Sequence, residues 1–154
     1  MNDSDTVKIL NGLIQTSEDG KKGFADAAEQ ATQQNLKTVF LGRSTDCATA
    51  ASELQALVGS LGGTAEESGT LSGAALRGWG KVRSAFGDAD LALLEAAESA
   101  EDTAKAVYAK ALASDLPEPI RVVVQRQGNG AVRNHDLIRK LRDDYRATAK
   151  ETAN

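Results

Sequence analysis

The sequence predicts an all-α protein, a four-helix bundle with a short crossover helix between its second and third long helices. Helix-favouring residues dominate the long segments, and no segment shows the sustained β-branched alternation of a strand. Apolar residues also recur every three or four positions through four long segments, which is the spacing of one helical face. The 154 residues are expected to form one domain, residues 1–154, that buries about 70% of its unfolded surface.

The first long helix is expected from about Asp5 to Thr32, with Ser4 or Asp5 as its N-cap. Its apolar stripe begins at Val7 and resumes at Phe24. Small and polar residues occupy the middle of the stripe or its edge: Ser17, Glu18, Gly20 and Lys21. The glycine indicates either close packing of a neighbouring helix or access to a site.

The second long helix is expected from about Leu36 to Leu61, where Gly62 and Gly63 end it. Arg43 falls on the core stripe of this helix, close to Cys47. Because arginine stays charged, it must either pair with carboxylates or carbonyls, or extend to solvent along its aliphatic stem. The single cysteine excludes an intrachain disulfide and is best interpreted as a small buried side chain.

The connection between the second and third long helices, residues 64–87, is glycine-rich and is the least regular part of the chain. Within it, the spacing of apolar residues predicts a short crossover helix from about Leu71 to Ala85, with Trp79 packed on an outer face of the bundle. A connection of this length exceeds what a tight helix hairpin needs and can carry the chain back along the bundle. The second and third long helices would then run parallel, as in ferritin-like bundles.

The third long helix is expected from about Ala89 to Ser114, followed by a fourth that begins near Pro117 or Pro119 and continues to about Ala147. The tail, residues 148–154, is expected to fray. On the third helix, ionisable residues occupy the face that should bury apolar side chains: Glu98, Glu101 and Lys105. A buried carboxylate is costly unless it is paired, protonated or bound to a metal.

Polar residues lie near the midpoint of all four predicted helices, and in a bundle these midpoints meet in one layer. The sequence therefore predicts a charge-paired core, with Lys21 and Arg43 facing Glu98 and Glu101. The full predicted network is Lys21, Arg43, Glu98, Glu101, Lys105, Gln127 and Asn134. His135 is expected at the edge of the stripe of the fourth helix.

A metal site is the alternative interpretation of this layer. A full di-metal carboxylate site needs two Glu-x-x-His motifs, and the chain has a single histidine. A reduced site for one divalent ion (Fe, Mn or Zn) would use Glu18, Glu53, Glu101 and His135. A pair of Cys47 and His135 is possible by bundle geometry but has no further support. No catalytic residues and no bound cofactor are therefore expected, and an enzymatic role is not predicted.

Charge and hydropathy limit the partners of the protein. A net charge of −4 argues against nucleic acid, because binding to phosphates requires a basic face. No apolar run approaches the roughly 20 residues of a membrane span, and the N-terminus lacks the features of a signal peptide. We therefore expect a cytoplasmic protein without nucleic-acid or membrane partners.

Several segments together resemble a bacterial family of ferritin-like four-helix-bundle proteins of unknown function. They cover nearly the whole chain: Leu10–Glu29, Ser52–Gly63, Gly73–Trp79, Leu94–Leu112 and His135–Asp143. The resemblance implies a ferritin-like bundle with a crossover segment but no particular activity. Members of that family tend to carry His-Arg-x-Trp in the crossover, where this chain has Leu76 in place of the histidine. This departure weakens the metal interpretation.

The predicted function follows from these points. The chain is expected to be a non-enzymatic bacterial protein with a structural, stress-linked or partner-binding role, and to form a homodimer. The alternative is a metal-binding carboxylate bundle with weak oxidative or storage chemistry.

Overall fold

The computed structural model describes residues 1–67 and 89–153, with side chains described as far as residue 148. This part of the chain contains helices and no strand, which confirms the all-α prediction. The helices are α1 (Asp3–Gln30), α2 (Gln34–Ser60), α4 (Ala89–Leu112) and α5 (Glu118–Ala153). The crossover helix predicted at residues 71–85, with Trp79, lies outside the described residues. None of the described helices combines the length and apolar character needed to cross a membrane.

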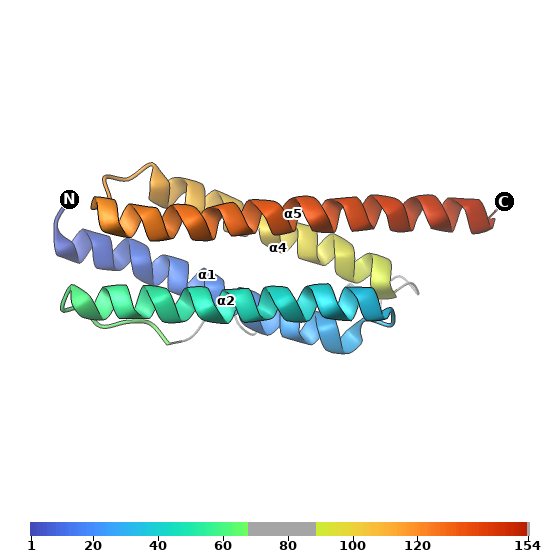
Figure 1. The fold of residues 1–154 in the computed structure, drawn as a ribbon, viewed down its shortest axis with the longest axis horizontal. Helices are drawn as coiled ribbons and strands as arrows, with labels where there is room; N and C mark the ends of the chain where they lie inside the picture. Colours follow the sequence, from blue (N-terminus) through green and yellow to red (C-terminus); the bar gives the residue numbers. More distant parts are fainter. Residues whose placement is uncertain (68–88, 154) are drawn as a thin grey trace.

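The four helices form two antiparallel hairpins, α1 with α2 and α4 with α5 (Figure 1). The helices α2 and α4 run in the same direction, because their first turns share one apolar cluster and their last turns share another. Leu36 and Leu94 belong to the first of these clusters, and Val58 and Ala111 to the second. The end of α2 and the beginning of α4 therefore lie at opposite ends of the bundle.

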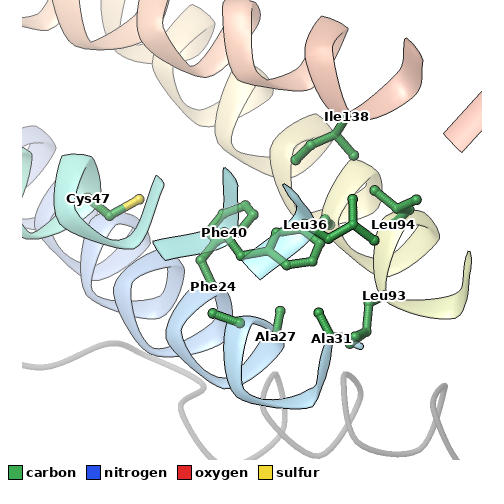
Figure 2. Packing of buried hydrophobic residues seen from close by; sticks show 11 residues of the cluster. Phe24, Ala27, Ala31, Leu36, Phe40, Cys47, Leu93, Leu94 and Ile138 are labelled. Atoms are coloured by element: carbon green, nitrogen blue, oxygen red, sulfur yellow. The ribbon is translucent and has the colours of Figure 1, made fainter. Parts of the chain in front are cut away.

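The apolar core consists of two layers, each built from all four helices. The Phe24 layer comprises Phe24, Ala27, Ala28, Ala31, Leu36, Phe40, Cys47, Leu93, Leu94, Ala97 and Ile138 (Figure 2). The Leu10 layer comprises Leu10, Leu13, Ile14, Leu54, Val58, Tyr108, Ala111, Leu116, Ile120 and Val124. In the Phe24 layer, the rings of Phe24 and Phe40 lie 6.2 Å apart between centroids and are tilted, as aromatic pairs prefer.

The first helix begins earlier than its predicted start, and neither Ser4 nor Asp5 is its N-cap. The cap is Asn2, whose side-chain oxygen accepts a hydrogen bond from the Asp5 amide at 2.8 Å. Asparagine caps as well as serine or aspartate does, and this choice places Asp3 and Asp5 in the first turn. Both carboxylates then lie near the positive end of the helix dipole.

The turn between α1 and α2 is held by a residue of α4. Asp90, only 1% exposed, accepts hydrogen bonds from the Thr32 amide at 2.8 Å and from the Thr32 hydroxyl at 2.7 Å. It also accepts from the Gln33 amide at 3.2 Å. These contacts satisfy backbone donors outside a helix, so α1 ends at Gln30 and not at the predicted Thr32.

Two further predictions about the helices were wrong. The last helix does not end near Ala147, because α5 continues to Ala153 through the segment expected to fray. On α2 the strict alternation of four- and three-residue steps from Leu36 and Phe40 predicts Ala50 and Leu57 at the buried face, but the structure buries Ala51 and Val58 instead. A strict seven-residue repeat drifts by about 20° around a straight helix, which accounts for a one-residue shift of the buried face.

Candidate functional site

A buried ion pair lies between the two apolar layers, at the middle of the bundle. Arg43 of α2 donates a hydrogen bond from Nη2 to Glu101 Oε1 of α4 at 3.2 Å. Its Nε lies 3.2 Å from Glu101 Oε2 but is not aligned for a hydrogen bond. The side chains of Arg43 and Glu101 are 10% and 2% exposed. Arg43 therefore pairs with a carboxylate and does not extend to solvent.

The surroundings of Glu101 do not fully compensate for the burial of its carboxylate. Burial raises the pKa of Glu101 above its ordinary value, and the charge and hydrogen bond of Arg43 offset only part of this increase. Asn134 lies close enough to Glu101 to lower the pKa of Glu101. The buried Asn134 Nδ2 nevertheless makes no hydrogen bond of ordinary geometry. A buried pair of this kind is weak evidence for stability, because the cost of removing both charges from water offsets much of their attraction.

A cavity of about 1020 Å³, partly open to solvent, adjoins the ion pair, and Arg43 and Glu101 form part of its wall. All four described helices contribute to its lining, and many of the lining side chains are small. Those on α1 and α4 include Thr16, Ser17, Gly20, Ala96, Ala100 and Ala104. Small side chains on facing helices leave the middle of the bundle open, whereas leucine and phenylalanine fill its ends.

Cys47 lines the same cavity and is a structural thiol. Its side chain is buried, and burial raises the pKa of the thiol to about 11. The thiol is therefore protonated near neutral pH and is a poor nucleophile. A Cβ atom added to Gly20 would lie 2.8 Å from Cys47 Sγ, so the glycine serves the close approach of α1 and α2.

A chain of hydrogen bonds links α4, α5 and α2 at one side of the cavity. The Tyr108 hydroxyl donates to Gln127 Oε1 at 2.9 Å, and Gln127 Nε2 donates to Glu53 Oε1 at 3.1 Å. Arg126 closes the chain with a contact of 2.6 Å from Nη2 to Glu53 Oε2. The Arg126 and Gln127 hydrogen bonds lower the pKa of Glu53, which is therefore an ionised partner of both residues.

The structure divides the predicted polar network into separate pairs. Arg43 and Glu101 meet, but Lys21 contacts Glu18 on its own helix at 2.8 Å. Glu98 instead contacts Arg142 of α5. Lys105 is half-buried, and Gln127 belongs to the Tyr108 chain described above.

The predicted metal ligands Glu18, Glu53, Glu101 and His135 are not brought together. The three carboxylates face Lys21, Arg126 and Arg43, respectively. His135 instead lies between Asp102 and Asp136, which are outside the predicted set. No group of three ligand atoms drawn from the predicted set is found in the described part of the chain.

A different group of possible ligands lies between α4 and α5. One ligand atom each from Glu98, Asp102 and His135 lies within 4.8 Å of the others. His135 Nε2 is 2.8 Å from Asp102 Oδ1, and His135 Nδ1 is 3.1 Å from Asp136 Oδ1. The His135 side chain is 6% exposed, so it lies deeper than the predicted edge of the stripe. The spacing of Glu98 and Asp102 could have indicated this group from the sequence, because residues four positions apart lie on the same face of a helix.

Comparison with known proteins gives a family without an assigned activity. The profile of a domain family of unknown function (DUF2383) matches residues 5–114. The matched range contains Arg43, Cys47 and Glu101 and ends before α5, which carries His135. No curated protein matches the chain.

Proposed function

We propose that this chain, which belongs to the DUF2383 family, is a non-enzymatic bundle that binds a small molecule in its central cavity. The observation that carries the proposal is the cavity of about 1020 Å³ at the middle of the bundle, with a buried ion pair in its wall. Ligand pockets in proteins commonly have volumes of about 300–1,000 Å³, so the space suits a small organic molecule. Of the structural, stress-linked and partner-binding roles predicted from the sequence, the cavity favours binding.

The chemistry of the cavity wall favours binding over catalysis. Its described lining contains no histidine, and its cysteine is a protonated thiol. The carboxylates of Glu53 and Glu101 are each held by an arginine. Nucleophilic catalysis needs an activated nucleophile beside a base, and neither the protonated thiol nor these two arginine-bound carboxylates supplies one.

The wall also indicates the character of the ligand. Alanines and Phe24 supply apolar surface, while Arg43 and Glu101 carry opposite charges that are already paired with each other. A ligand without a net charge leaves this pair intact and brings no unpaired charge into the bundle. The proposed ligand is therefore neutral, with an apolar body.

The remaining features of the proposal concern the topology and setting of the protein. The parallel course of α2 and α4 supports a ferritin-like arrangement of the four helices. A bacterial, cytoplasmic homodimer is proposed from the family resemblance described above. Sedimentation equilibrium of the purified chain tests the dimer directly, since a monomer mass at micromolar concentration contradicts it.

A neutral dye and a pair of matched variants test the binding role. Nile red is apolar with hydrogen-bond acceptors, and its emission rises on transfer from water to an apolar site. The substitution Ala104→Phe fills part of the cavity, whereas Ala109→Phe adds the same side chain at an exposed position of the same helix. We expect saturable binding by the wild type, at least tenfold weaker binding by Ala104→Phe and unchanged binding by Ala109→Phe.

Circular dichroism of each variant separates loss of binding from loss of fold. Ala100→Leu is a second, smaller filling substitution for the case in which Ala104→Phe unfolds. Absence of saturable binding by the wild type, or equal binding by the filling variants and the exposed control, would overturn the proposal.

A further inference from the structure

We propose that Glu98, Asp102 and His135 form a site for a single divalent transition-metal ion at the interface of α4 and α5. The site is separate from the central cavity, because none of these three residues is among the cavity-lining residues described. It also differs from the ligand set predicted from the sequence, with which it shares only His135. Three observations carry the proposal: the spacing of the ligand atoms, the surroundings of His135 and the helical positions of the carboxylates.

The spacing of the ligand atoms suits an ion. Nitrogen and oxygen ligands lie about 2.0–2.2 Å from a tetrahedral zinc ion, so two neighbouring ligands are roughly 3.3–3.6 Å apart. His135 Nε2 and Asp102 Oδ1 are 2.8 Å apart, and the Glu98 ligand atom lies within 4.8 Å of both. Small side-chain adjustments would bring all three to a common ion.

The surroundings of His135 independently indicate a cation at Nε2. Its side chain is more than nine-tenths buried, and each ring nitrogen faces a carboxylate oxygen. A neutral imidazole has one N–H and can donate to only one of the two carboxylates. With Nδ1–H donating to Asp136, the Nε2 lone pair faces Asp102, and this contact is repulsive unless a proton or a metal ion lies between them.

Asp136 has the position of a supporting residue in a metal site. Histidine ligands of metals usually donate their second ring nitrogen to a carboxylate, which fixes the tautomer and the orientation of the ring. The contact of 3.1 Å from His135 Nδ1 to Asp136 Oδ1 has this form. The ligand nitrogen would then be Nε2, on the side of Asp102 and Glu98.

The helices supply the ligands from two directions. Glu98 and Asp102 are one turn apart on α4 and project from the same face, while α5 supplies His135. The basic groups around the site oppose a cation: Arg142 contacts Glu98, Arg139 lies 3.7 Å from Asp136, and the charge of Lys105 acts on Asp136. A metal ion must share Glu98 with Arg142 or displace the Arg142 side chain, and this competition lowers the affinity of the site for the ion.

One nitrogen and two oxygen ligands suit Zn(II) better than Mn(II), following the usual order of affinities for divalent metals. The test is calorimetric titration of the full chain, without a histidine tag, with Zn(II) and Mn(II) separately. We expect one zinc ion per chain with micromolar affinity, and weaker binding of manganese. His135→Gln and Asp102→Asn should each weaken zinc binding at least tenfold, and Asp136→Asn about 10- to 100-fold.

Two further variants sharpen the titration. Arg142→Met removes the competing cation and should tighten zinc binding, whereas a merely structural role of the cluster predicts no such gain. Glu118→Gln is the matched control, since Glu118 is an exposed acid on the same helix as His135 and should leave binding unchanged. Asp102 is 59% exposed, so Asp102→Asn remains informative if His135→Gln fails to fold.

The single histidine of the chain permits a direct spectroscopic test. With ¹⁵N-labelled histidine, zinc should shift the Nε2 resonance of His135 while Nδ1 keeps its proton. A titration without one-to-one zinc binding, or with binding that survives His135→Gln and Asp102→Asn, would overturn the proposal.

Discussion

The ends and the middle of the bundle are built on opposite principles. The Phe24 layer and the Leu10 layer are filled by large apolar side chains, and Phe40, Leu54 and Val58 are fully buried there. The middle contains a cavity, small side chains and the Arg43–Glu101 pair. Burial of apolar area at the ends stabilises the fold, so the middle can retain costly charges and open space.

The largest expected effect tests the contribution of the end layers. Phe40→Ala should reduce the free energy of unfolding by about 4 kcal/mol, because it removes a fully buried aromatic ring and leaves a cavity. Leu41→Ala is the matched control on the adjacent, 54% exposed residue and should change stability by less than about 0.5 kcal/mol. Urea unfolding followed by circular dichroism measures both. Equal losses in the two variants would contradict the assignment of stability to the end layers.

The next effect concerns the ion pair of the middle layer. Glu101→Ala should cost about 3 kcal/mol, because it leaves the Arg43 guanidinium buried without its partner. This lies at the low end of the usual range, since the adjoining cavity can admit water to the arginine. The double variant Arg43→Met with Glu101→Leu should unfold within about 1 kcal/mol of the wild type or be more stable. A double variant no more stable than Glu101→Ala would show that the pair is a net source of stability.

The smallest effect concerns the contact between α1 and α2 at the cavity. Gly20→Ala should cost about 1–2 kcal/mol, because the new methyl group would lie 2.8 Å from Cys47 Sγ. In a Cys47→Ala background the same change should be neutral or slightly stabilising, since alanine favours helix by about 1 kcal/mol over glycine. Thermal unfolding of the four proteins in this cycle measures the coupling. Equal costs in both backgrounds would mean that Sγ does not determine the choice of glycine.

The layered plan of the core could be predicted from the sequence, because a period of three to four residues persists along each helix. The same pattern indicated a polar middle, and the structure places Arg43 beside Glu101 there. The ends of the helices could be predicted less well. Asn2 competes equally with Ser4 and Asp5 as a cap, and the end of α1 depends on Asp90, which is distant in the sequence.

The particular charge pairs could not be predicted from helical periodicity. Periodicity assigns a residue to a face but does not say which opposite charge its side chain reaches. Lys21 contacts Glu18 one turn away on its own helix, and Glu98 contacts Arg142 across the α4–α5 interface. Asn134 and His135 are adjacent in the sequence and so lie about 100° apart around the helix axis. Alanine and polar residues make up much of the predicted stripe there, so the sequence does not show which of the two side chains is more buried.

The hydrogen bonds of Asp90 have a consequence for the cooperativity of folding. Each hairpin is local in sequence, but the turn of the first hairpin obtains its acceptor only when the second hairpin docks. Neither hairpin completes an apolar layer by itself, because every layer takes residues from all four helices. The two hairpins therefore gain stability together, and exchange of the Thr32 amide with solvent reports on separation of the hairpins and not on local fraying of the turn.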